Sequence, residues 1–482
     1  MSFGLFGIAR NALLTHQTAL QTISQNIANA ETPGYSRQEA VLAANTPVRL
    51  PNGIVGTGVH VETIIRKRDI MLDDTVRAAS GQASNAGLRS TLLSQMEGVF
   101  GEPSDAGMSS ALDRFWNSWS DLASTPSSKA AHTAVQQSGR QVAQLFNSYD
   151  AQLTQQRNAS LERLTGTIAQ VNALARRVAD LNTRITTSES AGDSANDLRD
   201  QRDLALDSLS RVAGTRVLPQ ANGTVMVLLG NSALVDGDTA RPISMAFDIP
   251  VPPPAVTPSD IPVRLRLGDS PDRIMVPGGE LKALADGINT DIPLLRGRLD
   301  ALASALASTV NTAHSAGFVF AGNTIPGTAA GNFFDPGSFS TPVRAGTLAL
   351  DAIVAGDASQ VAVSGDANAP TDNAAALALS ALRTANATVT YTNPGGAVET
   401  GSFLGFFRNT VTSLGSSAKA AQDDATVFDL LTTQGEARRQ SVSGVSTDEE
   451  LVNLMRVQQS YTAATKLIKT ADEMLQTLLS LL

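Results

Sequence analysis

The N-terminal segment 5–30 carries a pattern of apolar residues that predicts one long amphipathic helix. Its apolar positions recur at alternating steps of three and four, which places them on one helix face, and this stripe includes Leu13, Leu20, Ile23 and Ile27. The sequence Thr32-Pro33-Gly34-Tyr35 follows. It predicts a type II turn, because proline suits the second position and glycine the third. Over residues 59–65 the period changes to two, which predicts a half-buried strand.

The C-terminal segment carries a seven-residue repeat that predicts a coiled-coil seam. One series of positions, each seven residues apart, is Leu454, Tyr461, Ile468, Leu475 and Leu482. A second series, three residues later, is Val457, Ala464, Ala471 and Leu478. A strict heptad repeat of this length favours a left-handed coiled coil. Because both chain ends have an apolar stripe, we expect the two terminal helices to pack together, within one subunit or between subunits of an assembly.

Between the two ends, helical and strand-like patterns alternate. Residues 70–210 have the helical period, and Trp116 and Trp119 lie on one apolar face, where we expect them in the core. Residues 211–277 are rich in β-branched residues, and their Asn-Gly pair predicts a hairpin. The remaining segments are a proline-rich stiff connector at 250–258, a helix at 279–316, a strand-like region at about 317–370, and a mostly helical remainder.

These patterns predict an elongated, multidomain α+β protein. Its terminal helices are expected to form a coiled-coil-like assembly domain, next to a central helical bundle with strand-rich inserted domains. The expected division is a terminal assembly domain of 1–60 plus 440–482, a helical rod domain of 61–210 plus 279–316 plus 372–439, a strand-rich insertion at 211–278, and a strand-rich insertion or irregular segment at 317–371.

Composition narrows the possible classes of function. The chain has 482 residues with a formal net charge of -9, which argues against a nucleic-acid binder with a broad basic face. It has no cysteine, which excludes disulfides, thiol nucleophiles and cysteine-ligated metals. No apolar run reaches the roughly 18 residues that a membrane span needs. The N-terminus lacks the basic region of a secretory signal peptide, so export would use another route.

Candidate catalytic and metal-binding residues are few. His314 could pair with Asp291 or Asp300 on the preceding helix, but a histidine near a helix C-terminus is the favoured interpretation. Acidic residues three apart, interleaved with arginines, favour ion pairs over a cation site, and they are Asp197, Asp200 and Asp203. No phosphate-binding loop or nucleophile elbow is present. We therefore expect no enzymatic activity, no cofactor and no metal.

Two terminal motifs resemble the signatures shared by bacterial flagellar rod, hook and hook-associated proteins. The residues that carry this resemblance are Asn29, Thr32, Pro33, Gly34 and Tyr35 near the N-terminus, and Gly444, Asp448, Glu449 and Glu450 near the C-terminus. Internal stretches are similar to the hook-associated protein 1 family in particular; these are 115–126, 195–203, 278–281, 311–317 and the Phe333-Phe334 pair. Thr447 and Val457 depart from the residues usual in the family.

The resemblance implies a structural, non-enzymatic axial protein that joins hook to filament by helical polymerisation through its terminal helices. The implied partners are further copies of the chain, the hook protein, a second hook–filament junction protein, and a cytoplasmic export chaperone on the C-terminal segment. Nucleic acid and membrane insertion are not implied. The implied location is the extracellular flagellum, reached through the flagellar type III apparatus without a cleaved signal peptide.

Two alternative functions remain open at this point. The chain could be another flagellar axial subunit of the rod or hook, although such a subunit would lack the 195–203 and 311–317 stretches. It could also be a secreted protein that uses flagellar-type ends for export, with a binding or hydrolytic segment within residues 211–400.

Overall fold

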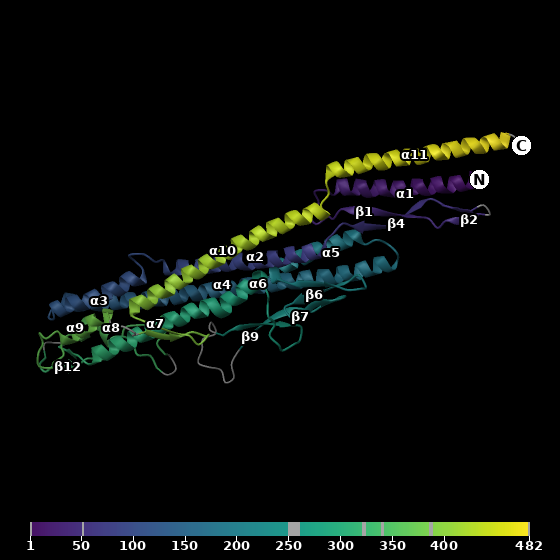
Figure 1. The fold of residues 1–482 in the computed structure, drawn as a ribbon. Coiled ribbons are helices and arrows are strands. Elements are labelled where there is room, and N and C mark those ends of the chain that lie inside the picture. The colour runs from purple at the N-terminus through teal and green to yellow at the C-terminus, as the bar shows by residue number, and fades with distance from the viewer. Residues whose placement is uncertain are drawn as a thin grey trace.

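The chain forms an elongated molecule whose long helices run roughly along its length (Figure 1). The computed structural model describes residues 2–50, 53–248, 261–320, 324–338, 342–384 and 389–480. Both termini lie at the same end, where α1 (Ser2–Ala28) and α11 (Thr447–Ser480) run side by side. The predicted elongated α+β fold is therefore confirmed. The expected connector at 250–258 and the last heptad position, Leu482, lie outside the described residues.

The N-terminal helix covers a small antiparallel sheet. The strands β1 (Gln38–Ala44) and β4 (Val59–Arg66) pair with each other, and both contact α1. Between them, β2 (Val48–Leu50) and β3 (Gly53–Val55) form a short hairpin. The type II turn after α1 is present, because Tyr35 N donates to Thr32 O over 3.2 Å and Gly34 has a φ of 82°.

A bundle of long helices forms the rod. Its members are α2 (Ile70–Phe100), α3 (Met108–Ser124), α4 (Lys129–Ser190), α5 (Asn196–Ala213), α6 (Gly279–Asp286), α7 (Ile292–Ser315) and α10 (Phe403–Ser443). The helix α10 lies along α2, and α4 packs against α3 and α5. Asp69 caps the start of α2, since its carboxylate accepts from Met71 N and Leu72 N. One π-helical turn at Gly287–Asp291 separates α6 from α7.

An aromatic cluster fills the rod near the end opposite the termini. Phe115 and Trp119 of α3 are fully buried, and Trp116 is nearly so, as expected. The ring centroid of Phe333 lies 5.4 Å from that of Trp119 and 5.7 Å from that of Phe115. These separations are typical of packed aromatic pairs. The cluster therefore joins α3 to the segment that follows α7.

Two sheets lie beside α4 in the first inserted region. A four-stranded antiparallel sheet contains β5 (Arg216–Pro219), β6 (Val225–Leu229), β7 (Ser232–Asp236) and β8 (Thr239–Ala240) in chain order. The strands β9 (Ile243–Phe247) and β10 (Val263–Leu267) form a separate pair. The β5–β6 hairpin turns at the predicted Asn-Gly pair, where Gly223 has a φ of 82°. Asn182 of α4 anchors this hairpin by donating to Val225 O over 2.9 Å.

The region 317–371 has little strand. Its described strands are the two-residue β11 (Phe318–Val319) and β12 (Thr328–Ala329), and its helices are the short α8 (Ala352–Gly356) and two 3-10 turns at Ala345–Thr347 and Ala358–Gln360. Of the two expected possibilities, strand-rich or irregular, the segment is irregular. A side chain takes the place of a neighbouring strand here. Asn311 Oδ1 accepts hydrogen bonds from Phe333 N and Phe334 N, so these backbone N–H groups are satisfied without sheet pairing.

The mostly helical segment 372–439 contains one hairpin that the sequence pattern did not indicate. The helix α9 (Ala374–Ala381) is followed by the hairpin of β13 (Val389–Thr392) and β14 (Val398–Gly401) before α10 begins. The sequence Asn393-Pro394-Gly395-Gly396 makes this turn, and Gly396 has a φ of 83°. Pro394 also disfavours helical geometry at the residue before it. Among the described helices, none is long and apolar enough to span a bilayer.

Candidate assembly interface

The seam, the apolar contact between α1 and α11, buries few of its side chains completely. Ala464 and Ala471 of α11 are buried, and the other described seam residues on this helix are half-buried: Leu454, Val457, Ile468 and Leu475. Tyr461 lies at the edge of the seam with 36% of its surface exposed. On α1, Ile23 is buried and three residues are half-buried, namely Leu13, Leu20 and Ile27. The side chain of Leu478 lies outside the described residues.

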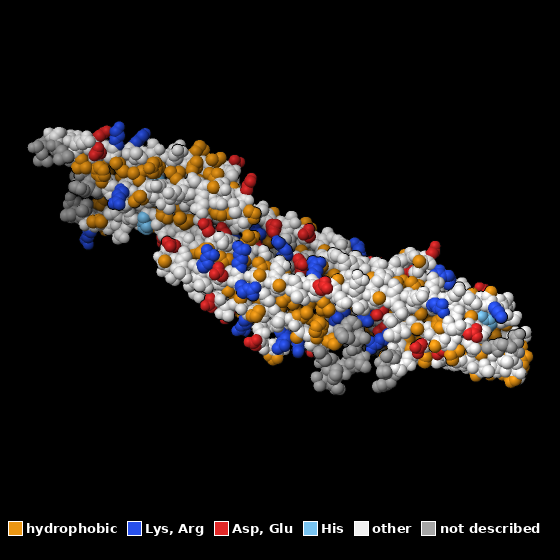
Figure 2. All heavy atoms as spheres, turned by 180° about the vertical axis from the view of Figure 1, so that it is seen from behind, with side chains coloured by type: hydrophobic (Ala, Val, Ile, Leu, Met, Phe, Trp, Pro, Cys, Tyr) orange, Lys and Arg blue, Asp and Glu red, His pale blue; other side chains and the backbone are white. Residues whose placement is uncertain are grey.

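The remaining faces of α11 expose large apolar side chains. Val452 is 60% exposed and Met455 is 55% exposed, and three further residues are similarly exposed: Leu451, Leu467 and Met474. The exposure continues onto the second half of α10 at Val427, Leu430 and Leu431. Figure 2 shows apolar side chains gathered along the pair of terminal helices. Exposed apolar surface of this extent is typical of an interaction surface.

A buried amide links the two terminal motifs. Asn26 of α1 is 1% exposed, and its Nδ2 donates to Gln38 O over 2.8 Å and to Glu450 Oε2 over 3.0 Å. Its Oδ1 accepts from Gln38 N and from the Tyr35 hydroxyl. Glu450 also accepts from Arg37 Nε over 2.9 Å. Both polar atoms of the Asn26 amide are therefore satisfied, as a buried polar group requires.

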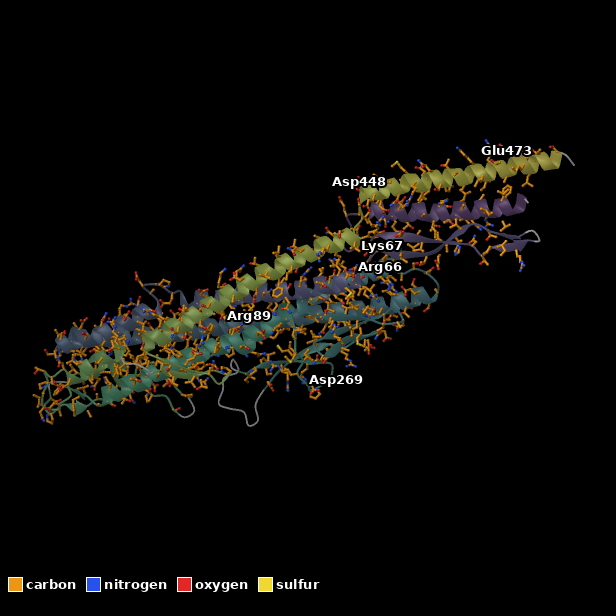
Figure 3. All side chains as sticks on the ribbon, in the orientation of Figure 1. Arg66, Lys67, Arg89, Asp269, Asp448 and Glu473 are labelled. Carbon is orange, nitrogen blue, oxygen red and sulfur yellow. The ribbon has the colours of Figure 1, made fainter. Side chains whose placement is uncertain are left out.

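The other motif residues surround this amide on the surface. Asn29 and Thr32 are joined by a hydrogen bond of 3.2 Å between their side chains, and Pro33 and Gly34 are exposed in the turn. Gly444 separates α10 from α11, and its N–H donates to Gln440 O. Asp448 and Glu449 are exposed in the first turn of α11, where carboxylates favour the helix dipole. Figure 3 shows Asp448 at the start of α11.

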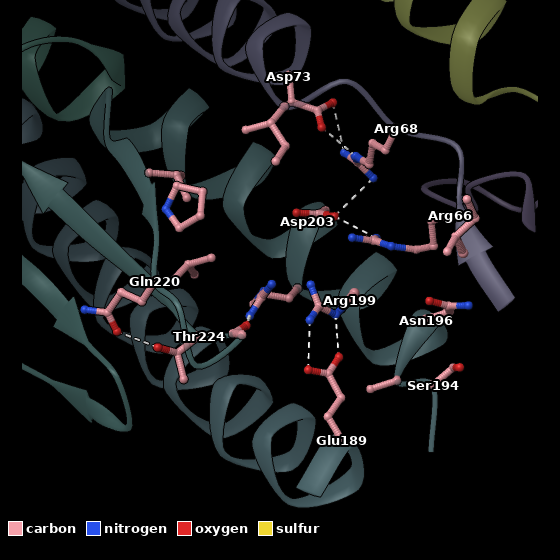
Figure 4. A pocket seen from close by; sticks show the side chains of 18 of the residues that line it. Arg66, Arg68, Asp73, Glu189, Ser194, Asn196, Arg199, Asp203, Gln220 and Thr224 are labelled. Atoms are coloured by element: carbon pink, nitrogen blue, oxygen red, sulfur yellow. Dashed lines mark hydrogen bonds and ion pairs between the residues drawn. The ribbon is translucent and has the colours of Figure 1, made fainter. Parts of the chain in front are cut away.

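A network of ion pairs, which we call the joint, connects the terminal sheet to the rod. Arg66 Nη1 lies 2.6 Å from Asp200 Oδ1 and 2.8 Å from Asp203 Oδ2. Arg68 pairs with Asp73 over 2.6 Å and with Asp203 over 3.3 Å (Figure 4). Ser36 donates to Asp200 from both its N–H and its hydroxyl. Arginines outside α5 therefore neutralise Asp200 and Asp203, whereas Asp197 accepts from Gln38 Nε2 over 3.1 Å.

The same network extends to α10. Asp207 Oδ1 accepts from Arg77 Nε, and its Oδ2 accepts from Arg439 Nη1, each over 2.7 Å. Burial alone would raise the pKa of Asp203, but Arg68, Arg66 and Arg77 outweigh it and hold that pKa below its usual value. The expectation of ion pairs at Asp200 and Asp203 is met, with partners that are distant in sequence.

Sequence reasoning missed Asn26, Arg66 and Arg68. A polar residue inside the apolar stripe of a long helix was the available signal for Asn26. The signal for the two arginines was their position at the end of the strand that returns to the rod. Neither signal indicates which residue is the partner. Arg66 and its partner Asp200, for example, are 134 positions apart in the sequence.

The candidate catalytic group around His314 does not form. The fully buried His314 accepts from Ala362 N at Nε2 over 2.9 Å, and its Nδ1 lies 2.8 Å from Gly331 O. Burial lowers the pKa of His314 to about 4, so the ring is neutral near pH 7. Asp300 accepts from Ala345 N, and Asp291 pairs with Arg89. Within the described residues, no three histidine or carboxylate side chains gather as a metal site.

Comparison with known proteins gives three matching families along the chain. The family described as the flagellar hook-associated protein FlgK helical domain matches residues 93–334. The flagella basal body rod protein family matches residues 6–35, and the flagellar basal body rod FlgEFG protein C-terminal family matches residues 438–481. Flagellar hook-associated protein 1 of Bacillus subtilis is 31% identical, and the alignment covers 97% of this chain and 96% of that protein. The chain belongs to the flagellar hook-associated protein 1 family.

A second curated relative matches nearly the whole length of this chain. Flagellar hook-associated protein 1 of Escherichia coli is 25% identical over 99% of both chains. The solved structure of the flagellar hook junction protein FlgK from Burkholderia pseudomallei superposes with a TM-score of 0.63 at 17% identity, covering 77% of this chain and 100% of that one. This structural likeness supports the fold. The two rod-protein families match residues 6–35 and 438–481, and these terminal segments pack against each other in the structure.

Proposed function

We propose that this chain is a structural axial protein of the bacterial flagellum that joins the hook to the filament. The observation that carries the proposal is the terminal helix pair, which leaves apolar side chains exposed on α11 in a single subunit. Relatives over the full length are flagellar hook-associated proteins, and this supports a flagellar location and a structural role. We propose no enzymatic activity and no cofactor.

Assembly proceeds through the terminal helices in this proposal. Copies of the chain polymerise helically when neighbours cover the exposed faces of α11 and complete the α1–α11 seam. Removing apolar surface from water stabilises such contacts by about 25 cal/mol per Å². The proposed interface residues are Leu13, Leu20, Ile23, Ile27, Leu454, Tyr461, Ile468, Leu475 and Leu478.

The partners and the export route follow from the same surface. The hook protein and a second junction protein would contact the two ends of the ring or helix that this chain forms. A cytoplasmic chaperone would cover the exposed apolar side chains of α11 before export through the flagellar type III apparatus, without a cleaved signal peptide. We propose the predicted division into a terminal assembly domain and a rod. The predicted boundary after residue 60 falls inside β4, which pairs with β1, so the joint, where Arg66 meets Asp200, supports a first boundary after β4.

Deleting the gene for this chain tests the proposal in cells. The expected phenotype is hooks without attached filaments, with flagellin released into the medium. Loss of the hook itself would instead favour a rod or hook subunit. Normal filaments on the mutant would contradict the junction role and favour a secreted protein with flagellar-type ends. Complementation with the wild-type gene is the control, because it must restore filaments.

A further inference from the structure

Arg202 of α5 is a buried cation that has no ion-pair partner among the residues that the structure describes. It is 3% exposed, and its Nη1 donates to Asn182 Oδ1 and to Gly223 O, each over 2.9 Å. Its Nε has no hydrogen-bond acceptor. Within the described part of the chain, no carboxylate oxygen lies within 4.0 Å of its guanidinium. A buried charge of this kind is unfavourable unless a counter-charge is supplied.

The neighbouring arginines differ from Arg202 in this respect. Arg66, Arg68 and Arg77 each pair with Asp203, and Arg199 forms two hydrogen bonds with Glu189. The carboxylates nearest to Arg202 are therefore engaged by other cations. Burial lowers the pKa of Arg202 to about 10; Asp203 and Glu189 oppose this effect, and Arg199 and Arg66 reinforce it. Neither Asp203 nor Glu189 forms an ion pair with Arg202, because each pairs with other arginines.

Arg202 lines a pocket between the end of α4, the start of α5, the strand β4 and the β5–β6 hairpin (Figure 4). The α5 helix begins at this pocket, and its N-cap residue, Ala195, has no side-chain acceptor for the first-turn N–H groups. Uncapped N–H groups at a helix start favour an anion. The lining contains five acidic residues: Asp73, Glu189 and Asp203 are paired with arginines other than Arg202, and Asp74 and Asp193 are partly or fully exposed to solvent. Water screens exposed carboxylates of this kind.

We propose that this pocket binds a small oxyanion, either inorganic phosphate or a carboxylate, with Arg202 as its charge partner and the start of α5 as a second donor. The oxyanion would supply the counter-charge that the chain itself does not give to Arg202. The site lies beside the joint and is separate from the apolar surface of α11. This inference does not depend on the proposed junction role.

Equilibrium dialysis of the full-length chain with radiolabelled phosphate, at constant ionic strength, tests the proposal. We expect saturable binding of one phosphate per chain and at least tenfold weaker binding by Arg202→Met. Arg184→Met is the matched control, because Arg184 is an exposed arginine of α4 paired with Asp180, and it should bind as the wild type does. Acetate is titrated separately as a competitor. Displacement only by phosphate identifies a phosphate site, and displacement by acetate identifies a carboxylate site.

A second pair of variants keeps the test decisive if Arg202→Met does not fold. Ser194 is exposed and lines the same pocket. Ser194→Asp places a carboxylate there and should weaken phosphate binding, whereas Ser194→Asn, of the same shape, should not. Phosphate should raise the thermal unfolding midpoint of the wild type and of Ser194→Asn more than that of Ser194→Asp. Absence of saturable binding of phosphate and of acetate to the wild type would overturn the proposal, as would equal binding by Arg202→Met.

Discussion

The terminal helix pair and the far end of the rod use apolar side chains in opposite ways. In the rod, Phe115, Trp119 and Phe333 are fully buried between several segments of one chain. On α11, Val452 and Met455 have more than half of their surface exposed. The rod therefore completes its core within one subunit, whereas α11 remains an open surface.

The difference comes from how many elements surround each helix. The helix α3 has α4, α9 and α10 around it, while α11 packs mainly on α1. Elements with few buried contacts open at low free-energy cost. The rod therefore maintains the fold of the subunit, and the terminal helices keep apolar surface free for contact with neighbouring subunits. Four predictions test this division, from the largest expected effect to the smallest.

Removing the rod's largest buried ring should have the greatest effect on stability. Trp119→Ala leaves a cavity in the aromatic cluster and should lower the free energy of unfolding by about 3–5 kcal/mol. Urea denaturation followed by circular dichroism measures this change. Leu451→Ala on exposed α11 is the control and should change the value by less than about 0.5 kcal/mol. Equal losses of stability in the two variants would contradict the conclusion that the rod, and not α11, maintains the fold.

Acidification should destabilise the rod through His314. The pKa of its ring is about 4 in the folded state, below the ordinary value of about 6.5. The unfolded chain therefore binds a proton more readily, and the stability present above pH 6.5 falls as the pH drops toward 4, by roughly 3 kcal/mol. His314→Gln should flatten this part of the pH profile, measured by urea denaturation at each pH. His60→Gln, at an exposed position of β4, should leave the wild-type profile unchanged.

Charges in the seam should abolish assembly while costing the isolated subunit little. Ile468→Asp with Leu475→Asp removes two half-buried side chains, so each loses less than the roughly 1.5–3 kcal/mol of a fully buried one. We expect the variant free in the medium and absent from hook tips, by immunoblot and immunogold labelling. Thr470→Asp with Gln476→Asp, both at exposed positions of the same helix, should assemble normally. Wild-type motility of the seam variant would exclude the seam as an assembly interface.

The last prediction concerns limited proteolysis of the wild-type monomer, in which no residue is changed. Residues near 1–40 and 445–482 should be cleaved before the rod, because α11 has few buried side chains. Mass spectrometry of the early fragments locates the cuts. Ends that resist protease as well as the rod does, in a verified monomer, would show that α1 and α11 form a stable pair on their own.

Local patterns predicted the parts of this structure that depend on neighbouring residues. The heptad positions of α11 gave the face that meets α1, and the Pro33-Gly34 pair gave the turn after α1. The hairpin of β13 and β14 also had a local signal in Asn393-Pro394-Gly395-Gly396, which the helical interpretation of that region overlooked.

Long-range pairing could not be predicted in the same way. Asn26 and Glu450 form a buried hydrogen bond across 424 positions, and periodicity carries no information about such partners. The Asp and Arg residues of α5 suggested ion pairs on the helix surface or between helices, without indicating the partners. In the structure, Asp203 pairs with Arg66 and Arg77 of other elements. Which arginine pairs with each carboxylate depends on the segments that the folded chain brings together around α5. A local sequence pattern does not contain this information.

The contact between Asn26 and Glu450 has a consequence for the order of folding. During synthesis α1 emerges before the rod, and its partner α11 emerges after it. Closing a loop of this length in an unfolded chain costs entropy that grows with loop length. Once the rod has folded, however, Arg37 N lies 2.9 Å from Ser443 O, so the segment that follows α1 and the segment that precedes α11 are held together. The late step is then a short local docking, and the rod serves as the template on which the two ends find each other.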